Sequence, residues 1–223
     1  MERHFERELG ELKSNLVAMG SLVDQQINEA CNALFEGDRK LAERVIKTDA
    51  AVNDFDTLID KQCQRIFALS QPVAIDLRLL MSALKINNEI ERIGDIAVNI
   101  AERVEPLVLY QKFLHTTRLS EMAQIARIMV KDSLDAFVGN NPGIATRVLE
   151  SDDVVDSLDR TVFRQMVTAM KADSSMIDPA SHIIVLSRHI ERLADHSTNI
   201  AEDVIFLVDA KIVKHNAFQE NES

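Results

Sequence analysis

Residues 79–104, LLMSALKINNEIERIGDIAVNIAERV, carry an apolar side chain at every third or fourth position. The residues of this apolar seam are Leu79, Ala83, Ile86, Ile90, Ile93, Ala97, Ile100 and Val104. Such a seam lies along one face of an α-helix and is typical of helices in bundles and coiled coils. Since no comparable stretch of the chain alternates with period two, the pattern predicts an all-α fold.

Proline and turn residues mark the ends of the helices. Prolines fall at four breaks in the apolar pattern, at Pro72, Pro106, Pro142 and Pro179. Proline is tolerated in the first turn of a helix and breaks a helix interior. Gly37-Asp38 and Gly139-Asn140-Asn141 supply turn residues at two further breaks. We therefore expect six long helices, at about residues 4–35, 38–69, 74–105, 116–138, 142–171 and 179–213, with neighbours antiparallel because the loops are short.

Composition and charge limit the possible functions. The net charge is −11, and such an acidic surface repels DNA, RNA and anionic lipid. The charged first residues, 1–6, lack the apolar core of a signal peptide, and every apolar run is far shorter than the ~20 residues of a membrane helix. Cys31 and Cys63 are too few for a disulfide framework. We expect a cytoplasmic protein with both cysteines in its core, no nucleic-acid partner and no direct membrane insertion.

An internal repeat divides the chain into two halves. Glu91-Arg92-Ile93-Gly94-Asp95 recurs one hundred positions later as Glu191-Arg192-Leu193-Ala194-Asp195, and residues 44–49 recur as residues 147–152. The repeat predicts two tandem three-helix bundles of long antiparallel helices, over residues 1–110 and 111–215, followed by a frayed tail at 216–223. Core packing explains a repetition of apolar residues but not a repetition of charges, so the repeated acids are candidates for function.

Acidic side chains form two stripes in each repeat. On a helical wheel of about 100° per residue, Glu91 and Asp95 lie on one side of their helix, away from the apolar seam. The preceding helix carries a second stripe that includes Asp49 and Asp56, and the other repeat has equivalents of both stripes. The candidate site residues are Asp49, Asn53, Asp56, Glu91, Asp95, Asp152, Asp156, Asp159, Glu191 and Asp195.

Two interpretations of these stripes stay open from the residues alone. One is a solvated acidic helix face, although such faces usually mix the two signs of charge, and like charges four residues apart mildly destabilise a helix. The other is a metal site, in which carboxylates of neighbouring helices converge on a cation. Oxygen ligands suit Mg²⁺, Mn²⁺, Ca²⁺ or iron, and the absence of cysteine from the stripes excludes a thiolate zinc site.

No catalytic constellation is recognisable in the sequence. The chain has no glycine-rich phosphate loop and no Glu-x-x-His pair of the ferritin-like di-metal enzymes. This favours a binding or regulatory protein over an enzyme. Two alternatives remain, namely a carboxylate-cluster metalloenzyme and a histidine phosphorelay protein that uses His189 or His196. We expect these histidines to be surface or packing residues, because the first repeat has Glu89 and Ile96 at their positions.

The duplicated Glu-Arg-[Ile/Leu]-[Gly/Ala]-Asp helices, together with residues 44–56, 76–79 and 190–204, resemble the PhoU family of bacterial phosphate-transport regulatory proteins. The resemblance extends over about residues 2–210. It implies a cytoplasmic helical protein, commonly a homodimer, that acts with the ATPase subunit of the high-affinity phosphate ABC transporter and with a phosphate-sensing histidine kinase. It implies a negative regulator, which restrains uptake and keeps the phosphate-starvation response off when phosphate is plentiful.

The resemblance also implies a metal cofactor. The acidic E(D)-x-x-x-D motifs of the family bind divalent ions or metal clusters, which points to Mg, Mn, Fe or Zn in this chain. By position the motifs correspond to Glu91 with Asp95, Glu191 with Asp195, Asp152 with Asp156, and Asp49 with Asn53. Asn53 departs from the strict motif, so the first-repeat cluster is expected to carry less charge.

Overall fold

The computed structural model describes residues 2–70, 72 and 75–210. Its long helices in this range are α1 (Glu2–Glu36), α2 (Arg39–Ser70), α3 (Ile75–Glu102), α6 (Leu119–Gly139), α7 (Pro142–Ala172) and α8 (Ile177–Asp209). Short helical segments connect the long helices, namely α4 (Val104–Leu107), η1 (Val108–Tyr110), α5 (Gln111–Leu114) and η2 (Ser174–Met176). The described residues contain no strand, and the predicted all-α fold with six long helices is confirmed.

The helix ends differ from the predicted ones by a few residues, for local reasons. The third long helix ends at Glu102, and the segment through Pro106 forms short helical turns where a plain loop was expected. Helix α8 begins at Ile177, which places Pro179 in the first turn, where its missing N–H needs no partner. The same helix ends at Asp209, and the next residue, Ala210, has a left-handed φ of 56°. The expected helix end at 213 and the tail at 216–223 lie outside the described residues.

The turns between the first two helices of each repeat have the same construction. Gly37 and Asn140 adopt left-handed φ angles of 69° and 47°, which suits residues that tolerate this region. The next residues, Asp38 and Asn141, cap the following helices, and the side chain of each accepts hydrogen bonds from two backbone N–H groups of the first turn. The repeat seen in the sequence therefore extends to the backbone of these turns.

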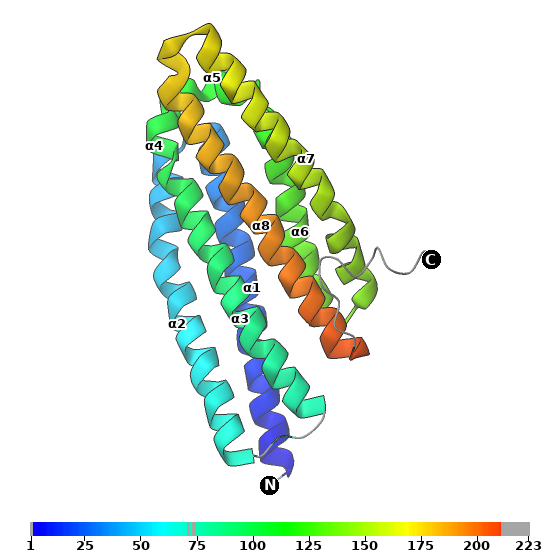
Figure 1. Ribbon diagram of the computed structural model, residues 1–223. Helices are drawn as coiled ribbons and strands as arrows, with labels where there is room; N and C mark the ends of the chain where they lie inside the picture. The colour runs from blue at the N-terminus through cyan, green and yellow to red at the C-terminus, as the bar shows by residue number, and fades with distance from the viewer. Residues whose placement is uncertain (1, 71, 73–74, 211–223) are drawn as a thin grey trace, which may run out of the picture.

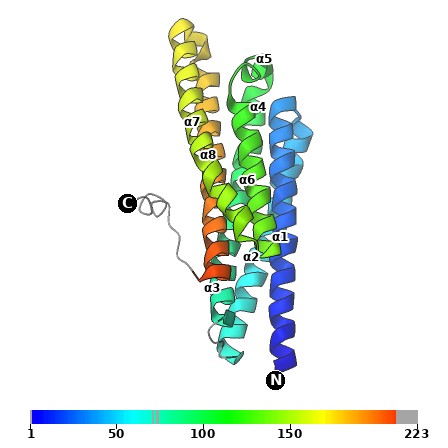
Figure 2. The ribbon, with the colours of Figure 1, turned by 90° about the vertical axis from the view of Figure 1, so that its right-hand side faces the viewer.

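The two repeats share one hydrophobic core. Helices α1, α2 and α3 pack against one another, as do α6, α7 and α8, and the repeats meet where α3 packs on α8 and α1 on α6 (Figure 1). The buried apolar side chains form a single cluster that includes residues from all six long helices. Figure 2 shows the resulting elongated bundle from its side. Cys31 and Cys63 are buried in it as free thiols, as predicted, and burial raises the pKa of these thiols to about 11 and about 12.

Polar contacts cross the boundary between the repeats. Lys85 Nζ lies 2.8 Å from Asp203 Oδ1, so α3 and α8 are joined by an ion pair. Glu89 of α3 accepts a hydrogen bond from the Asn199 amide of α8 at 3.1 Å, and its carboxylate lies 2.7 Å from His196 Nδ1. These contacts join residues more than one hundred positions apart, and together with the shared core they make the two bundles one unit.

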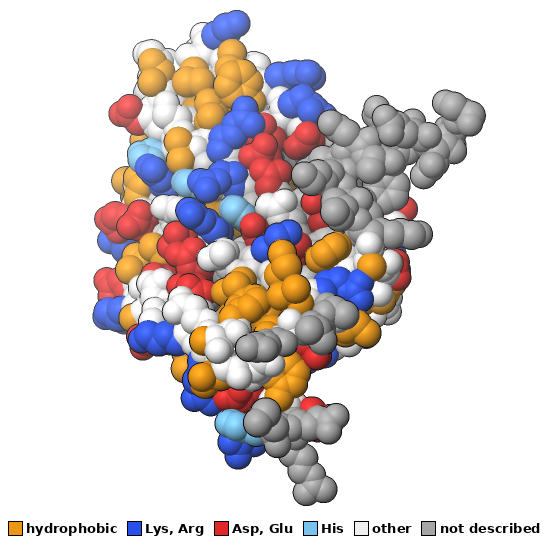
Figure 3. Space-filling view, turned by 60° about the horizontal axis from the view of Figure 1, so that its bottom comes forward, with side chains coloured by type: hydrophobic (Ala, Val, Ile, Leu, Met, Phe, Trp, Pro, Cys, Tyr) orange, Lys and Arg blue, Asp and Glu red, His pale blue; other side chains and the backbone are white. Residues whose placement is uncertain are grey.

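The surface of the bundle is not uniform. Near the turn between α2 and α3, Leu69 and Ile75 are 73% and 68% exposed, with Leu77 and Met81 exposed beside them. Figure 3, which brings this end of the molecule forward, shows hydrophobic side chains gathered there, charges of both signs above them and a second hydrophobic group near the upper edge of the view. None of the helices in the described part of the chain is long and apolar enough to span a membrane.

Candidate functional site

The predicted acidic residues lie where the second and third helices of each repeat pack together. Helices α2 and α3 supply the first cluster, which we define as Asp49, Asn53, Asp56, Glu91 and Asp95. Helices α7 and α8 supply the second cluster, which we define as Asp152, Asp156, Asp159, Glu191 and Asp195. The helical wheel placed these stripes away from the core seam, and in the structure they border it, with the side chains of Glu91 and Glu191 only 27% and 25% exposed.

The pKa of Glu91 reflects the acidic side chains that the fold places near it in the first cluster. Burial raises the pKa of Glu91, and the negative charge of Asp95, on the same helix, raises it further. Asp56 and Asp49, on the neighbouring helix, add smaller effects in the same direction. Arg92 opposes them, since its Nε lies 3.9 Å from the Glu91 carboxylate. The carboxylates of two helices therefore repel one another here, as the metal-site interpretation requires.

The second cluster has a similar arrangement of acids around Glu191. Burial raises the pKa of Glu191, followed by the charge of Asp195 and then by Asp159 and Asp156 across the helix interface. The cation that lowers this pKa is Arg188, on the same helix. Asp95 and Asp56 act on Glu91 as their equivalents Asp195 and Asp159 act on Glu191, so this part of the electrostatic environment is duplicated along with the sequence.

The innermost acid of each cluster is held by a buried hydrogen-bond donor. Asn87 Nδ2, from a fully buried side chain of α3, donates to Asp56 Oδ1 at 2.6 Å. In the second repeat Ser187 Oγ donates to Asp159 Oδ1 at 2.7 Å. Sequence reasoning missed both donors. The available signal was a polar residue recurring one hundred positions apart within the apolar seam of the third helix.

The two clusters differ in how far their charge is neutralised by the protein. Arg188 Nη1 lies 2.9 Å from Asp159 and 3.9 Å from Glu191, and Arg160 lies 3.6 Å from Asp156. The position equivalent to Arg188 in the first repeat is Asn88, which is uncharged. The second cluster thus contains its own cation between two of its acids.

At the outer end of the first cluster, Asn53 replaces the aspartate found at Asp156 in the second. Its amide Nδ2 donates to Asp49 Oδ2 at 2.9 Å, one helical turn away. This amide therefore stabilises the neighbouring carboxylate, where a second acid would repel it.

A metal site needs suitable ligand atoms and a suitable arrangement of them. Carboxylate oxygens are suitable donors for a hard cation, and each cluster gathers them from two helices. Within the described ranges, however, no three Asp, Glu, His or Cys side chains lie close enough together to hold one ion. The inner acids are instead engaged by Asn87, Ser187 and Arg188. Ion binding by these clusters stays a prediction, and it requires side chains to turn toward a shared ion.

Gly94 lies beside the first cluster because two other helices approach it closely. A Cβ at this position would lie 3.2 Å from Val52 Cγ1 of α2 and 3.4 Å from Gln26 Oε1 of α1. The second repeat accommodates Ala194, which is 1% exposed, at the equivalent position. Close helix packing, rather than a ligand, accounts for this glycine.

The two histidines of the phosphorelay alternative lie inside the bundle surface. His196 is paired with Glu89 across the repeat boundary, and its side chain is 15% exposed. His189 is partly buried, and burial lowers the pKa of its imidazole, assisted by Arg103 and Arg192. Both positions agree with the expected packing role.

Comparisons with known proteins agree with this architecture. The PhoU domain family matches the chain twice, at residues 16–104 and 119–204. A phosphate-specific transport system accessory protein PhoU homolog from Pseudomonas putida is 38% identical over 218 residues, which cover 96% of this chain and 84% of the relative. A homolog of the same name from Aquifex aeolicus is 38% identical over 214 residues, which cover 96% of this chain and 97% of the relative.

Solved structures of relatives have the same fold. The crystal structure of PhoU from Pseudomonas aeruginosa is similar with a TM-score of 0.87 at 37% identity, covering 93% of this chain and 100% of that one. The phosphate transport system regulatory protein PhoU from Streptococcus pneumoniae gives 0.85 at 28% identity, covering 94% and 99%. The fold and its paired acidic clusters define a helical protein built from two three-helix repeats. The chain belongs to the PhoU family.

Proposed function

We propose that this chain is a negative regulator of phosphate uptake and of the phosphate-starvation response. The observation that carries the proposal is the match of both repeats to the PhoU domain, together with relatives named as accessory proteins of a phosphate-specific transport system over nearly their whole length. A regulatory protein needs specific surfaces rather than a reaction centre, and we propose that this chain is not an enzyme.

The proposed partners are the ATPase subunit of the phosphate ABC transporter and a phosphate-sensing histidine kinase, which the chain couples at the cytoplasmic side. A net charge of −11 favours association with basic protein surfaces over nucleic acid. We further propose that the active form is a homodimer. The exposed apolar end of the bundle, near Leu69 and Ile75, differs from the mixed-charge surface and supports an interaction with protein.

The regulatory role is tested by deleting the gene and measuring a phosphate-starvation reporter in medium rich in phosphate. We expect the reporter to become active and phosphate uptake to rise, and both to return to normal when the wild-type chain is restored. A reporter that stays silent in the deletion strain would contradict the role, whatever the chain binds.

We propose that the two acidic clusters bind divalent or iron ions, drawn from Mg, Mn, Fe and Zn. The support is the repulsion within each cluster, since a cation shared between helices removes the cost of holding these carboxylates together. Because Arg188 already neutralises part of the second cluster, the first cluster is expected to depend more strongly on an added ion.

Metal analysis of purified protein tests this site separately from the role. Glu91→Ala/Asp95→Ala should lower the bound metal per chain, and Glu191→Ala/Asp195→Ala should do the same for the second cluster. The matched control is Glu6→Ala/Glu36→Ala, since both residues are exposed on α1, outside the clusters. Unchanged metal content in both cluster variants would refute the metal assignment and leave the regulatory role standing.

The partners are tested by affinity capture of the tagged chain from phosphate-replete cells, with and without a chelator. We expect the transporter ATPase and the histidine kinase to be captured, and the chelator to reduce their yield. Capture of neither protein from either preparation would contradict the proposed coupling.

A further inference from the structure

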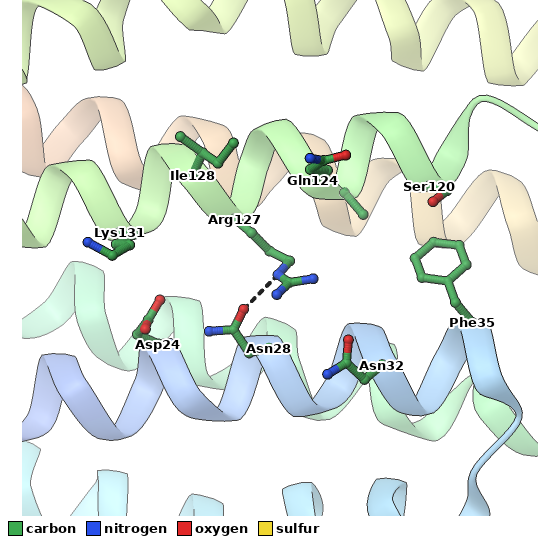
Figure 4. Close-up of a pocket in the computed structure, with 10 residues that line it drawn as sticks. Asp24, Asn28, Asn32, Phe35, Ser120, Gln124, Arg127, Ile128 and Lys131 are labelled. Atoms are coloured by element: carbon green, nitrogen blue, oxygen red, sulfur yellow. Dashed lines mark hydrogen bonds between the residues drawn. The ribbon is translucent and has the colours of Figure 1, made fainter.

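A groove lies between α1 and α6, and none of its lining residues belongs to either acidic cluster. It has a volume of about 470 Å³, which is within the range of small-molecule sites. Figure 4 shows its two walls, with Asp24, Asn28, Asn32 and Phe35 on α1 facing side chains of α6. Nothing in the regulatory proposal above uses this groove, and the inference drawn from it does not depend on that proposal.

Different side chains line the two ends of the α1–α6 contact. At one end Leu134 packs against Gly20 so closely that a Cβ on the glycine would lie 3.0 Å from Leu134 Cδ2. The groove lies toward the other end, where its lining includes Ala123 and Phe35.

A cationic side chain, that of Arg127, lines this groove, although the chain as a whole has a net charge of −11. Arg127 of α6 extends between the two helices, where its Nε donates to Asn28 Oδ1 at 2.7 Å (Figure 4). This is the only hydrogen bond of its guanidinium among the described residues, within which Arg127 also forms no ion pair. A positioned guanidinium with unused donors is the side chain best suited to bind a phosphoryl or carboxylate group.

Further unused donors surround the guanidinium. In the described part of the chain, the side chains of Asn32, Ser120 and Gln124 make no hydrogen bond to protein, and all three line the groove. Lys131 lies at the end near Asp24, and it is paired with Asp135. Donors from two helices fit the several oxygens of a tetrahedral anion better than the two oxygens of a carboxylate.

At the opposite end of the groove, the ring of Phe35 forms part of the wall beside Ser120 (Figure 4). The volume is far larger than a free phosphate ion needs, and an aromatic ring is a suitable surface for the organic part of a ligand. We propose that the groove binds a small phosphate ester, whose phosphoryl oxygens contact Arg127, Gln124 and Asn32 while its organic part lies toward Phe35.

Titration calorimetry with adenosine 5′-monophosphate tests the proposal, with inorganic phosphate and adenosine as comparison probes. We expect the monophosphate to bind the wild-type chain, and either fragment alone to bind at least tenfold more weakly. Arg127→Gln should weaken binding of the monophosphate at least tenfold. The control Arg164→Gln, an exposed residue of α7 outside the groove, should leave it unchanged. Circular dichroism and thermal unfolding establish that each variant is folded.

A second variant separates ligand binding from a structural effect. Asp24 places a negative charge in the same groove, so Asp24→Asn should tighten binding of the monophosphate, the opposite of the change at Arg127. Inorganic phosphate that binds as tightly as the monophosphate would overturn the ester assignment. No binding of the monophosphate at millimolar concentration, or equal binding by wild type and Arg127→Gln, would overturn the site itself.

Discussion

At the scale of single residues, Asn87 shows how a buried amide stabilises the acidic cluster. Its side chain is fully buried and donates to Asp56 Oδ1. Burial raises the pKa of Asp56, and the negative charge of Asp60 raises it further. The hydrogen bond opposes that rise. A buried donor of this kind is expected to matter more to stability than the exposed acids of the same stripe, because removing it leaves a partly buried carboxylate without a partner.

Asn87→Ala should lower the free energy of unfolding by about 1–3 kcal/mol, because the Asp56 carboxylate loses its donor. Urea denaturation followed by circular dichroism measures the effect. Asn88→Ala, at an exposed position next along the helix, is the control and should stay within about 0.5 kcal/mol of wild type. Equal effects of the two substitutions would show that the hydrogen bond adds nothing to stability.

Asp24 gives a prediction about pH. Burial is the main cause that raises its pKa, and Lys131 and Arg127 only partly oppose it. A carboxyl group whose pKa is higher in the folded state binds its proton more tightly there, so its ionisation lowers stability as pH rises through that folded-state pKa. As the pH is raised from about 4 toward neutrality, Asp24→Asn should therefore gain stability relative to wild type, since only the wild-type side chain becomes charged. The gain should level off once the folded-state carboxyl has ionised.

Urea denaturation of both proteins across this pH range measures the difference. Glu6→Gln, at an exposed site of the same helix, should show no such trend. A stability difference that is constant with pH would mean that the Asp24 carboxyl has the same pKa in the folded and unfolded chains.

At the scale of elements, the turns after α1 and α6 end these helices and cap the N-termini of the next ones. Each turn needs a residue with positive φ followed by a side chain that caps a helix N-terminus, and the two repeats meet both needs with different residues. Glycine suits the positive φ in the first repeat, and asparagine replaces it in the second. The requirement is thus for a backbone conformation and not for a particular residue.

Exchanging these turn residues tests that requirement. Asp38→Ala and Asn141→Ala should each cost about 0.5–2 kcal/mol of unfolding free energy through loss of the cap. Gly37→Val should cost at least about 1–2 kcal/mol, because a β-branched residue does not tolerate its φ of 69°. Asn140→Gly should be neutral or stabilising. Thermal and urea denaturation measure all four, and a stable Gly37→Val variant would contradict this account.

At the scale of the whole molecule, the shared core couples the repeats. Helix α3 carries two of the five residues of the first cluster, and α8 carries two of the five of the second. The two helices pack against each other and are joined by the Lys85–Asp203 pair. Each cluster is therefore built on a helix whose other side contacts the opposite repeat. A change in the spacing of α2 and α3 would be transmitted to α8 through this contact.

The shared core predicts that the chain unfolds as one unit. Urea titration followed by far-ultraviolet circular dichroism and by fluorescence of Tyr110, the only tyrosine, should give coincident single transitions. Tyr110 lies in the connection between the repeats, so its signal reports on their junction. A plateau between two transitions, or separate midpoints from the two probes, would show that the repeats are independently stable.

The helices and the repeat could be predicted from the sequence because their causes are local. Apolar spacing, proline positions and turn residues such as Gly37-Asp38 act within a few positions of the chain, and the duplicated acids are visible by inspection. The short helices after Arg103 were not predicted, because proline was treated as the end of helical structure although it is tolerated in a first turn. The ten candidate site residues, nine acids and Asn53, could be named, but not their distances from one another.

By itself, then, the sequence determined six long helices, their duplication and the existence of the acidic stripes, since each depends on residues close together along the chain. The tertiary structure decided that the stripes of neighbouring helices meet, that Asn87 and Ser187 hold the inner acids, and that Arg188 neutralises part of one cluster. It also decided that the groove at Arg127 stays open. These features depend on how helices distant in sequence pack, because that packing brings together side chains such as Arg127 and Asn28, which lie about one hundred positions apart.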